Sequence, residues 1–359
     1  MKNTSFLLYG ANGYTGELIA RYAGQYGLQP ILAGRRKEVI EPLAARLGLP
    51  YLVFDLNDSA ALHDALRQVS VVIHAAGPFS RTAKAMVEAC LQAGVHYLDI
   101  NGDISVFEFV KSYHDQAVKA GVMLLPGAGF DVVPTDCIAL QLKKQLPDAV
   151  SLQLAFATLG GGISHGTALT MSEKIGDGGA VRREGKIVRA PLGGEGMTLD
   201  FNGKFIFVMS IPWGDISTAF HTTGIPNITT YTGMSKKVYS ILKFQSLFNW
   251  LLRTRLVRNY LKSKIDSRPP GPSDQQREKA TAFVWGRATN ASGSSVTLSL
   301  QGPEGYTLTT HSALIIAKKV LEGNFRSGYQ TPGSAYGEDL VLEIPGVVRS
   351  AVKYNQAPF

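Results

Sequence analysis

Short apolar runs alternate with segments of helical periodicity along the first 125 residues. Between the first two runs, Leu18, Ile19, Tyr22, Ala23 and Tyr26 recur at the spacing of one helix face. Buried strands that alternate with helices require right-handed crossovers and a parallel sheet. The pattern predicts a Rossmann-type, doubly wound α/β domain. The predicted strands are 5–9, 30–33, 51–54, 69–74, 95–100 and 122–125.

The pattern changes near residue 130. A loop rich in Gly and Pro covers 126–134, and a helix is expected at 135–145. Strand-like runs then lie between glycine loops, which favours an α+β domain with a mainly antiparallel sheet. These runs are 151–158, 205–211, 281–289 and 295–300, and a last helix is expected at 311–321. Since 359 residues exceed the usual size of one core, we predict two domains.

Composition favours a globular protein in a reducing, cytoplasmic setting. Cys90 and Cys137 are the two cysteines, too few for a disulfide framework or a four-cysteine zinc site. The seven histidines are scattered, so no metal site is predicted. No run of about 18 apolar residues predicts a membrane-spanning helix. The apolar stretch Phe6–Tyr9 is too short for a signal peptide.

The positive charge of the chain is concentrated in one segment. Residues 236–268 hold nine basic residues and one acid, a net +8 that equals the charge of the whole chain. This favours one basic face over a diffuse nucleic-acid surface, and we expect no nucleic-acid partner. Within 236–264, a helix is predicted with one apolar stripe. The stripe comprises Ile241, Phe244, Phe248, Leu251, Leu252 and Leu256, with Trp250 nearby.

Two interpretations of this basic segment remain open. It could pack internally or in a homodimer interface with its charges solvated. It could instead lie on a membrane or lipid surface, with cations near anionic headgroups, as a peripheral contact.

A glycine loop follows the first predicted strand and opens the first helix. It comprises Gly10, Asn12, Gly13, Tyr14, Thr15 and Gly16, with Ala11 between the first two. Glycine permits a tight turn and a close approach to a pyrophosphate, and the helix N-terminus offers N–H donors. In this strand–loop–helix context the loop predicts dinucleotide binding rather than a purely structural turn.

The end of the second strand indicates which dinucleotide is bound. NAD-binding domains carry an acid there for the ribose 2′-hydroxyl, whereas this chain has Arg35 and Arg36. Guanidinium groups can bind a 2′-phosphate through two bonds, so we predict NADP(H). The alternative is that both arginines only end a strand at the surface. Asp55, after the third strand, is a candidate for the adenine amino group or a surface acid.

The fourth strand ends in small residues that leave room for the second ribose and the nicotinamide. Ala75, Gly77 and Pro78 are predicted to contact the cofactor there, with close packing as the alternative.

Further motifs extend in order over nearly the whole chain. They are HYLDINGD (96–103), GAGFDVVPTD (127–136), GGGISHGT (160–167), GPS (271–273) with Trp285-Gly286, GPEGYTL (302–308) and TPGSAYG (331–337). With the glycine loop, the Gly34-Arg35-Arg36 step and the turn at 76–79, these motifs resemble the saccharopine dehydrogenase-like oxidoreductases. The similarity is greatest to the branch of trans-acting enoyl reductases.

This resemblance implies an architecture and a reaction class. The architecture is a Rossmann domain at 1–130, an α+β domain for substrate or dimerisation at 131–310, and a segment 311–359 that returns to the first domain. The implied activity is NADP(H)-dependent reduction of a carbon–carbon double bond in a hydrophobic or lipid-linked substrate. Eukaryotic relatives of this family associate with lipid bodies.

Candidate proton donors follow the predicted strands, but none has decisive spacing. Asp99 follows the fifth strand, Asp131 follows the sixth, and His165 lies in a glycine-rich loop of the second domain. Asp131 could equally cap the next helix. Tyr and Lys four residues apart occur as Tyr239/Lys243 and Tyr260/Lys264, both in the basic segment, where coincidence is the simpler explanation.

Two other functions remain open. An amino-acid-derived imine could be the acceptor, in which case Arg182, Arg183 or Arg189 could hold its carboxylates. The chain could also be a non-catalytic NADP-binding sensor or scaffold, since no catalytic acid is evident.

Overall fold

The computed structural model describes residues 5–242, 248–252 and 254–355. The chain forms two compact units. Unit 1 comprises Met1–Val133 and Gly305–Ala335, and unit 2 comprises Pro134–Glu304 and Tyr336–Phe359. The domain limits expected from the sequence, at 130 and 310, stay a prediction about functional domains.

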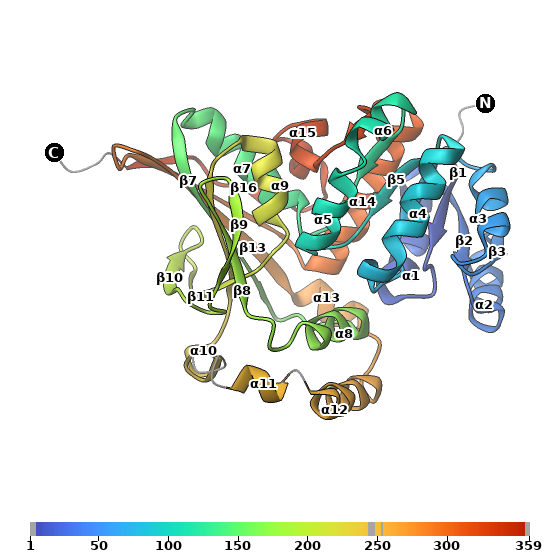
Figure 1. The fold of residues 1–359 in the computed structure, drawn as a ribbon, viewed down its shortest axis with the longest axis horizontal. Helices are drawn as coiled ribbons and strands as arrows, with labels where there is room; N and C mark the ends of the chain where they lie inside the picture. The colour runs from blue at the N-terminus through green and yellow to red at the C-terminus, as the bar shows by residue number, and fades with distance from the viewer. Residues whose placement is uncertain (1–4, 243–247, 253, 356–359) are drawn as a thin grey trace. The chain divides into compact units, whose positions relative to one another are not determined.

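Unit 1 is built on a parallel sheet (Figure 1). Its strand order is β15-β6-β5-β4-β1-β2-β3, so the direction of winding reverses between β1 and β4. Ligands of doubly wound sheets bind at the carboxyl ends of the strands beside such a reversal. The strands are β1 Ser5–Tyr9, β2 Gln29–Gly34, β3 Tyr51–Val53, β4 Val71–His74, β5 His96–Asp99, β6 Met123–Leu125 and β15 Gly328–Tyr329.

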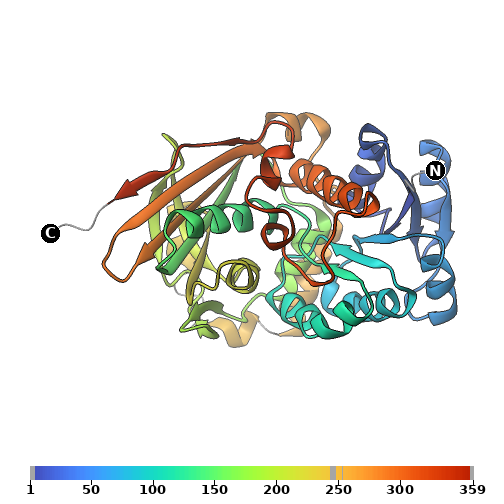
Figure 2. The same cartoon turned by 90° about the horizontal axis from the view of Figure 1, so that it is seen from above.

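Helices cover both faces of the unit 1 sheet, with α1 and α14 packed together on one face (Figure 2). The central strands β4, β5 and β6 are buried along their whole length, as continuous apolar runs predict, whereas the edge strand β3 is partly exposed. The helices are α1 Tyr14–Tyr22, η1 Ala23–Tyr26, α2 Lys37–Leu47, α3 Ser59–Leu66, α4 Phe79–Ala93, α5 Ile104–Lys111, α6 His114–Lys119 and α14 Gly305–Leu321, with α15 Pro332–Tyr336 at the unit boundary.

Unit 2 contains a mainly antiparallel sheet. Its order is β10-β11-β12-β7-β13-β14-β16, and only the β12–β7 pair is parallel among the described strands. Three further strands extend it: β8 pairs with β12, β9 with β8, and β17 with β14. The strands are β7 Ala149–Leu159, β8 Gly179–Arg183, β9 Lys186–Ala190, β10 Gly196–Asp200, β11 Phe205–Ile211, β12 Asn227–Gly233, β13 Thr281–Asn290, β14 Ser295–Pro303, β16 Val348–Arg349 and β17 Lys353–Asn355.

The helices of unit 2 include three that follow one another through the basic segment (Figure 1). They are α7 Val133–Gln145, α8 His165–Glu173, α9 Asp215–Thr223, α10 Lys236–Leu242, α11 Asn249–Leu252, α12 Arg255–Asp266, α13 Asp274–Lys279 and η3 Leu340–Glu343. None of the described helices is long and apolar enough to cross a membrane.

The predicted fold class, a doubly wound parallel sheet with a mainly antiparallel second sheet, is confirmed. The single helix predicted over 236–264 is wrong. Thr254 has an extended backbone (φ −67°, ψ 147°), and its hydroxyl accepts the N–H of Val257, so a new helix begins there. The predicted stripe residue Phe244 lies outside the described residues.

A glycine in β13 tests the packing of unit 2. A Cβ at Gly286 would lie 2.4 Å from Ile138 Cγ2 and 2.8 Å from Leu142 Cδ1 of α7. Gly286→Ala should therefore destabilise the protein by roughly 1–3 kcal/mol and lower its Tm in a thermal melt. Gly24→Ala is the control, because a Cβ there meets nothing within 4 Å. An equal Tm for both variants would contradict this packing.

Candidate nucleotide-binding site

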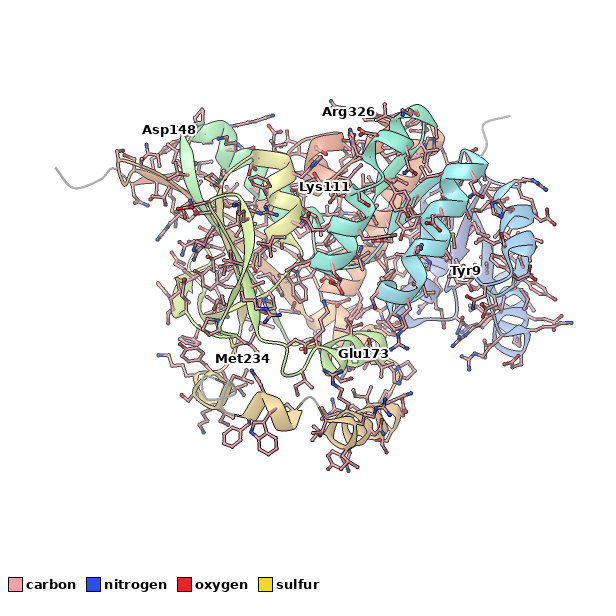
Figure 3. All side chains as sticks on the ribbon, in the orientation of Figure 1. Tyr9, Lys111, Asp148, Glu173, Met234 and Arg326 are labelled. Carbon is pink, nitrogen blue, oxygen red and sulfur yellow. The ribbon has the colours of Figure 1, made fainter. Side chains whose placement is uncertain are left out.

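The glycine loop is held too tightly for side chains at two of its positions. Gly10 has a φ of +89°, and a Cβ there would lie 2.6 Å from the backbone nitrogen of Ala76. A Cβ at Gly16 would lie 2.3 Å from the carbonyl oxygen of Gly10. The loop thus brings the end of β1 against the turn after β4, where the sheet reverses. Tyr9, labelled in Figure 3, is the last residue of β1 before the glycine loop.

The N-terminus of α1 is open to an anion. Its N-cap, Gly13, is extended and provides no side-chain cap for the first turn. The backbone N–H groups of Gly10 and Ala11 donate to the carbonyl oxygen of Ala33, at 2.8 and 3.2 Å, which fixes the loop to β2. Helix N–H donors and the positive end of the helix dipole favour a phosphate at such a position.

The side chains of the loop have different surroundings. Asn12 is exposed. Its Oδ1 lies close to Gly34, because a Cβ built at Gly34 would be 3.1 Å from this oxygen. The ring of Tyr14 packs edge-on against Tyr306 of α14, with 5.0 Å between centroids. The Tyr14 side chain therefore braces α1, which leaves its backbone as the part that a cofactor could contact. Thr15 lies in the first turn of α1.

Arg35 and Arg36 are exposed directly after β2. Their guanidinium groups are therefore accessible to a phosphate near the glycine loop. Asp55, after β3, accepts hydrogen bonds from Asn57 N and Nδ2 at 2.9 and 2.7 Å, so its Oδ1 builds a local turn. Its predicted contact with adenine stays a prediction.

The turn after β4 is anchored from both sides. Ala75 N donates to the carbonyl oxygen of Tyr9 at 2.8 Å. Thr82 Oγ1, in α4, donates to the carbonyl oxygen of Ala76 at 2.8 Å and lies 2.9 Å from His74 Nε2. Burial lowers the pKa of His74 to about 3, so its imidazole is neutral and structural. An isolated histidine in the sequence gives no signal of this role.

The exposure of the turn suits its predicted function. Ala75 is half-buried, Gly77 is exposed, and the Gly77–Pro78 peptide bond is cis. The contacts predicted for Ala75, Gly77 and Pro78 with a cofactor stay a prediction.

Asp99 holds together the loops that follow β5 and β6. Its Oδ1 accepts Asn101 N, Asn101 Nδ2 and Gly127 N at 3.0, 2.6 and 2.9 Å, and its Oδ2 accepts the Tyr97 hydroxyl at 2.7 Å. The side chain is fully buried, and burial raises its pKa. With both oxygens occupied, Asp99 is placed to position these loops.

Asp131 lies over the loop after β5. A Cβ at Gly102 would be 2.8 Å from Asp131 Oδ2. Burial raises the pKa of Asp131 to about 7. Both protonation states are therefore populated near neutral pH, as an acid–base group requires.

His165 belongs to unit 2, at the start of α8. Its Nε2 lies 2.8 Å from Asp266 Oδ1 at the end of α12. Ser164 caps α8 by accepting the N–H of Thr167. The imidazole therefore links α8 to α12, and its predicted role in catalysis stays a prediction.

The other groups considered in the sequence have structural surroundings. Burial raises the pKa of the Cys90 and Cys137 thiols, which keeps them protonated. Lys264 Nζ lies 5.7 Å from the ring centroid of Tyr260, and Lys243 lies outside the described residues. Among the described residues, no three His, Cys, Asp or Glu side chains gather as a metal site would need.

One hollow of about 360 Å³ adjoins the glycine loop. It lies between α1 and α2 and shares Asn12 with the loop. Arg46 and Glu17, which line it, form an ion pair at 2.7 Å.

A comparison with known protein families concerns the part of the chain that contains the glycine loop. Residues 6–125 match the family model of the saccharopine dehydrogenase NADP binding domain. The match covers about a third of the chain. The resemblance predicted from the sequence is thereby confirmed, and unit 1 contains a nicotinamide-dinucleotide-binding domain.

Curated relatives of the NADP-binding domain are oxidoreductases by name. A mouse saccharopine dehydrogenase-like oxidoreductase is 27% identical over 202 residues, 49% of this chain and 47% of that protein. A trans-acting enoyl reductase of Mycobacterium bovis is 30% identical over 147 residues, 39% of this chain and 35% of that protein. The chain thus spans about half the length, or less, of these relatives.

One solved structure shares the fold over the whole chain. Apo saccharopine dehydrogenase (L-Glu forming) from Saccharomyces cerevisiae aligns with a TM-score of 0.67 at 14% identity, covering 98% of this chain and 100% of that one.

The raised pKa of Asp131 makes a prediction about stability. An acid whose folded pKa is raised stabilises the fold below its unfolded pKa, and this contribution is lost as the pH rises through about 7. Asp131→Asn removes the titration. The Tm of the variant minus that of the wild type should therefore become more positive between pH 4.5 and pH 8.

Thermal melts of both proteins across this pH range measure the difference. Gln116→Ala, at an exposed position of α6 whose side chain does not titrate, is the control and should give a flat difference. A flat difference for Asp131→Asn as well would show that the pKa of the Asp131 carboxyl is not raised in the folded protein.

Proposed function

We propose that the chain is an NADP(H)-dependent oxidoreductase that reduces a carbon–carbon double bond of a hydrophobic or lipid-linked substrate. The observation that carries the proposal is the pair of exposed guanidinium groups, Arg35 and Arg36, after β2 of an NADP-binding domain.

The residues around the glycine loop fit NADP(H). The α1 N-terminus would hold the pyrophosphate, and Arg35 and Arg36 would hold the 2′-phosphate through charge-assisted bonds. The turn at Ala75–Pro78 would adjoin the nicotinamide end, because the cofactor of such a sheet extends across the reversal between β1 and β4. When bound, NADPH supplies a hydride.

Reduction of a double bond also requires a proton. One carbon receives the hydride, and the neighbouring carbon receives a proton from an acid. Asp131 is the acid that the structure supports best, since its pKa of about 7 leaves it partly protonated at neutral pH. Asp99 would act as a positioning residue, because its carboxylate accepts four hydrogen bonds.

Two observations favour a carbon–carbon double bond over an imine as the hydride acceptor: the name of one relative, and the contacts of the arginines that could hold the carboxylates of an imine. The proposal of a double bond is supported by the relative named trans-acting enoyl reductase. An imine with carboxylates would need free guanidinium groups, but Arg182 is buried. It donates to the carbonyl oxygens of Ile216 and Gly185 at 2.6 and 2.5 Å and lies 4.1 Å over the Phe220 ring. Arg183 is exposed but bonds to Thr229 and lies 3.7 Å from Glu195 Oε1, and Arg189 is exposed.

The arginine pair makes a direct prediction about cofactor choice. Arg35→Ala with Arg36→Ala should weaken NADPH binding by about 10- to 100-fold, the size of one or two charge-assisted bonds. NADH binding should change little, because NADH lacks the 2′-phosphate. Calorimetric titration of both cofactors gives the ratio. Arg67→Ala, an exposed arginine at the end of α3, is the control. Equal losses for NADPH and NADH would contradict the assignment.

Asp131 makes a prediction about turnover. With an enone substrate and NADPH, Asp131→Asn should lower kcat by about 100-fold or more while leaving the NADPH Kd unchanged. The wild-type kcat should fall as the pH rises above about 7, because the protonated acid is then lost. The variant should lack this fall. NADPH oxidation is followed with panels of hydrophobic enones and of imines.

Each outcome of that assay has a clear meaning. Turnover of imines alone would replace the double bond as the acceptor. Tight NADPH binding with no turnover of either panel would favour a sensor or scaffold and contradict the proposed activity.

A further inference from the structure

The helices α10, α11 and α12 leave large apolar side chains uncovered. Trp250 is 72% exposed and Leu256 is 83% exposed, values far above those of ordinary core residues. The three helices follow one another along one border of unit 2 (Figure 1). We call the exposed apolar side chains on them, together with Phe248 directly before α11, the apolar row. The apolar row comprises Ile241, Phe248, Trp250, Leu256 and Tyr260. Such a concentration marks an interaction surface.

Internal packing of α12 does not explain the row. Val257, Leu261 and Ile265 recur every four residues and are partly or fully buried. They form the face by which α12 packs on its own unit, where α8 is its neighbour. Leu256 and Tyr260 recur at the same spacing on a second face, which remains exposed. The helix therefore has one apolar face that packs on the protein and a second apolar face that is exposed.

Exposed cations lie on the same helices as the apolar row. Lys236, Lys237, Arg255, Lys262 and Lys264 are exposed on α10 and α12. The stretch 236–268 carries a net +8, while the rest of the chain is neutral overall. Its single acid, Asp266, is held by His165. A partner must thus accept apolar side chains and offer negative charge at the same surface.

We propose that α10–α12 dock on an anionic lipid bilayer, with the apolar row between the lipids and the cations at their phosphates. Interfacial helices have this combination of Trp, Leu and Phe with Lys and Arg. A tryptophan is well suited to the headgroup level because its ring is amphipathic. This docking is independent of the proposed reaction, which concerns unit 1.

Two other partners fit the surface less well. A second copy in a two-fold dimer would bring two clusters of eight net positive charges together, which opposes association. A nucleic acid would neutralise the cations through its phosphates but would leave aliphatic side chains such as Ile241 and Leu256 exposed to water.

Vesicle binding of the full chain tests the proposal. The probes are phosphatidylcholine vesicles with and without phosphatidylglycerol, read by co-sedimentation and by tryptophan fluorescence. The wild type should bind the anionic vesicles, shift its emission to the blue, and bind less in high salt. It should bind pure phosphatidylcholine far more weakly.

Two double variants separate the apolar and charged contributions. Trp250→Ser with Leu256→Ser should weaken binding by about tenfold or more and abolish the blue shift. Lys262→Gln with Lys264→Gln should weaken binding by about fivefold for each cation lost near the anionic surface. A thermal melt checks that each variant is folded.

A matched control lies at the other end of the unit 2 sheet. Val348 and Tyr354 are 67% and 62% exposed, on strands that pair with β14. The basic helices adjoin the opposite end of this sheet, where Tyr239 of α10 packs against Phe207 of β11. Val348→Ser with Tyr354→Ser should leave vesicle binding unchanged.

Several results would overturn the proposal. They are equal binding to both kinds of vesicle, absence of binding, or unchanged binding by the Trp250/Leu256 variant. If the wild type sediments as a dimer and the Trp250/Leu256 variant as a monomer, while vesicle binding is unchanged, the surface would be assigned to a second copy.

Discussion

The close approach of Gly10 to the backbone of Ala75 and Ala76 is the constraint on which the rest of the nucleotide site depends. No side chain fits there, since a Cβ would lie 2.6 to 2.9 Å from backbone atoms. The contact joins β1 to the turn after β4 at the reversal of the parallel sheet. α1 begins directly after this loop with no side-chain cap at its N-terminus, and Arg35 and Arg36 follow the neighbouring strand β2.

A second network extends this order to the loops after β5 and β6. Asp99 accepts hydrogen bonds from Asn101 and Gly127 and so joins both loops. Asp131 then lies against Gly102, in surroundings that bring its pKa to about 7. Two carboxylates in neighbouring loops thereby have different roles: one is saturated with donors and positions the backbone, and the other can exchange a proton.

Local patterns in the sequence were enough to predict the parallel sheet and the glycine loop. A buried strand is a short apolar run, and a nucleotide loop is a set of glycines between a strand and a helix, so both are visible within a few residues. Strands such as β12, with its sequence NITTYTG, were missed because polar Thr residues hide the alternation. β15 has only two residues, which is too short for any pattern.

The parts of the site that depend on distant contacts could not be predicted. Tyr14 packs against Tyr306, His165 bonds to Asp266, and the donors of Arg182 are taken by backbone carbonyls. Each pairing joins residues whose separation in the chain carries no local signal. A new helix begins after Thr254, where its side chain caps the N–H of Val257. The apolar spacing of the basic segment fits one long helix equally well, so the sequence pattern gave no sign of this start.

The most direct measurement is a calorimetric titration of the wild-type protein with NADPH and, separately, with NADH. If the glycine loop holds the pyrophosphate and the arginine pair holds the 2′-phosphate, NADPH should bind at least about tenfold more tightly. That preference should shrink as salt is added, because both guanidinium groups are exposed. Equal affinity for the two cofactors, a preference for NADH, or no binding of either would contradict the central claim.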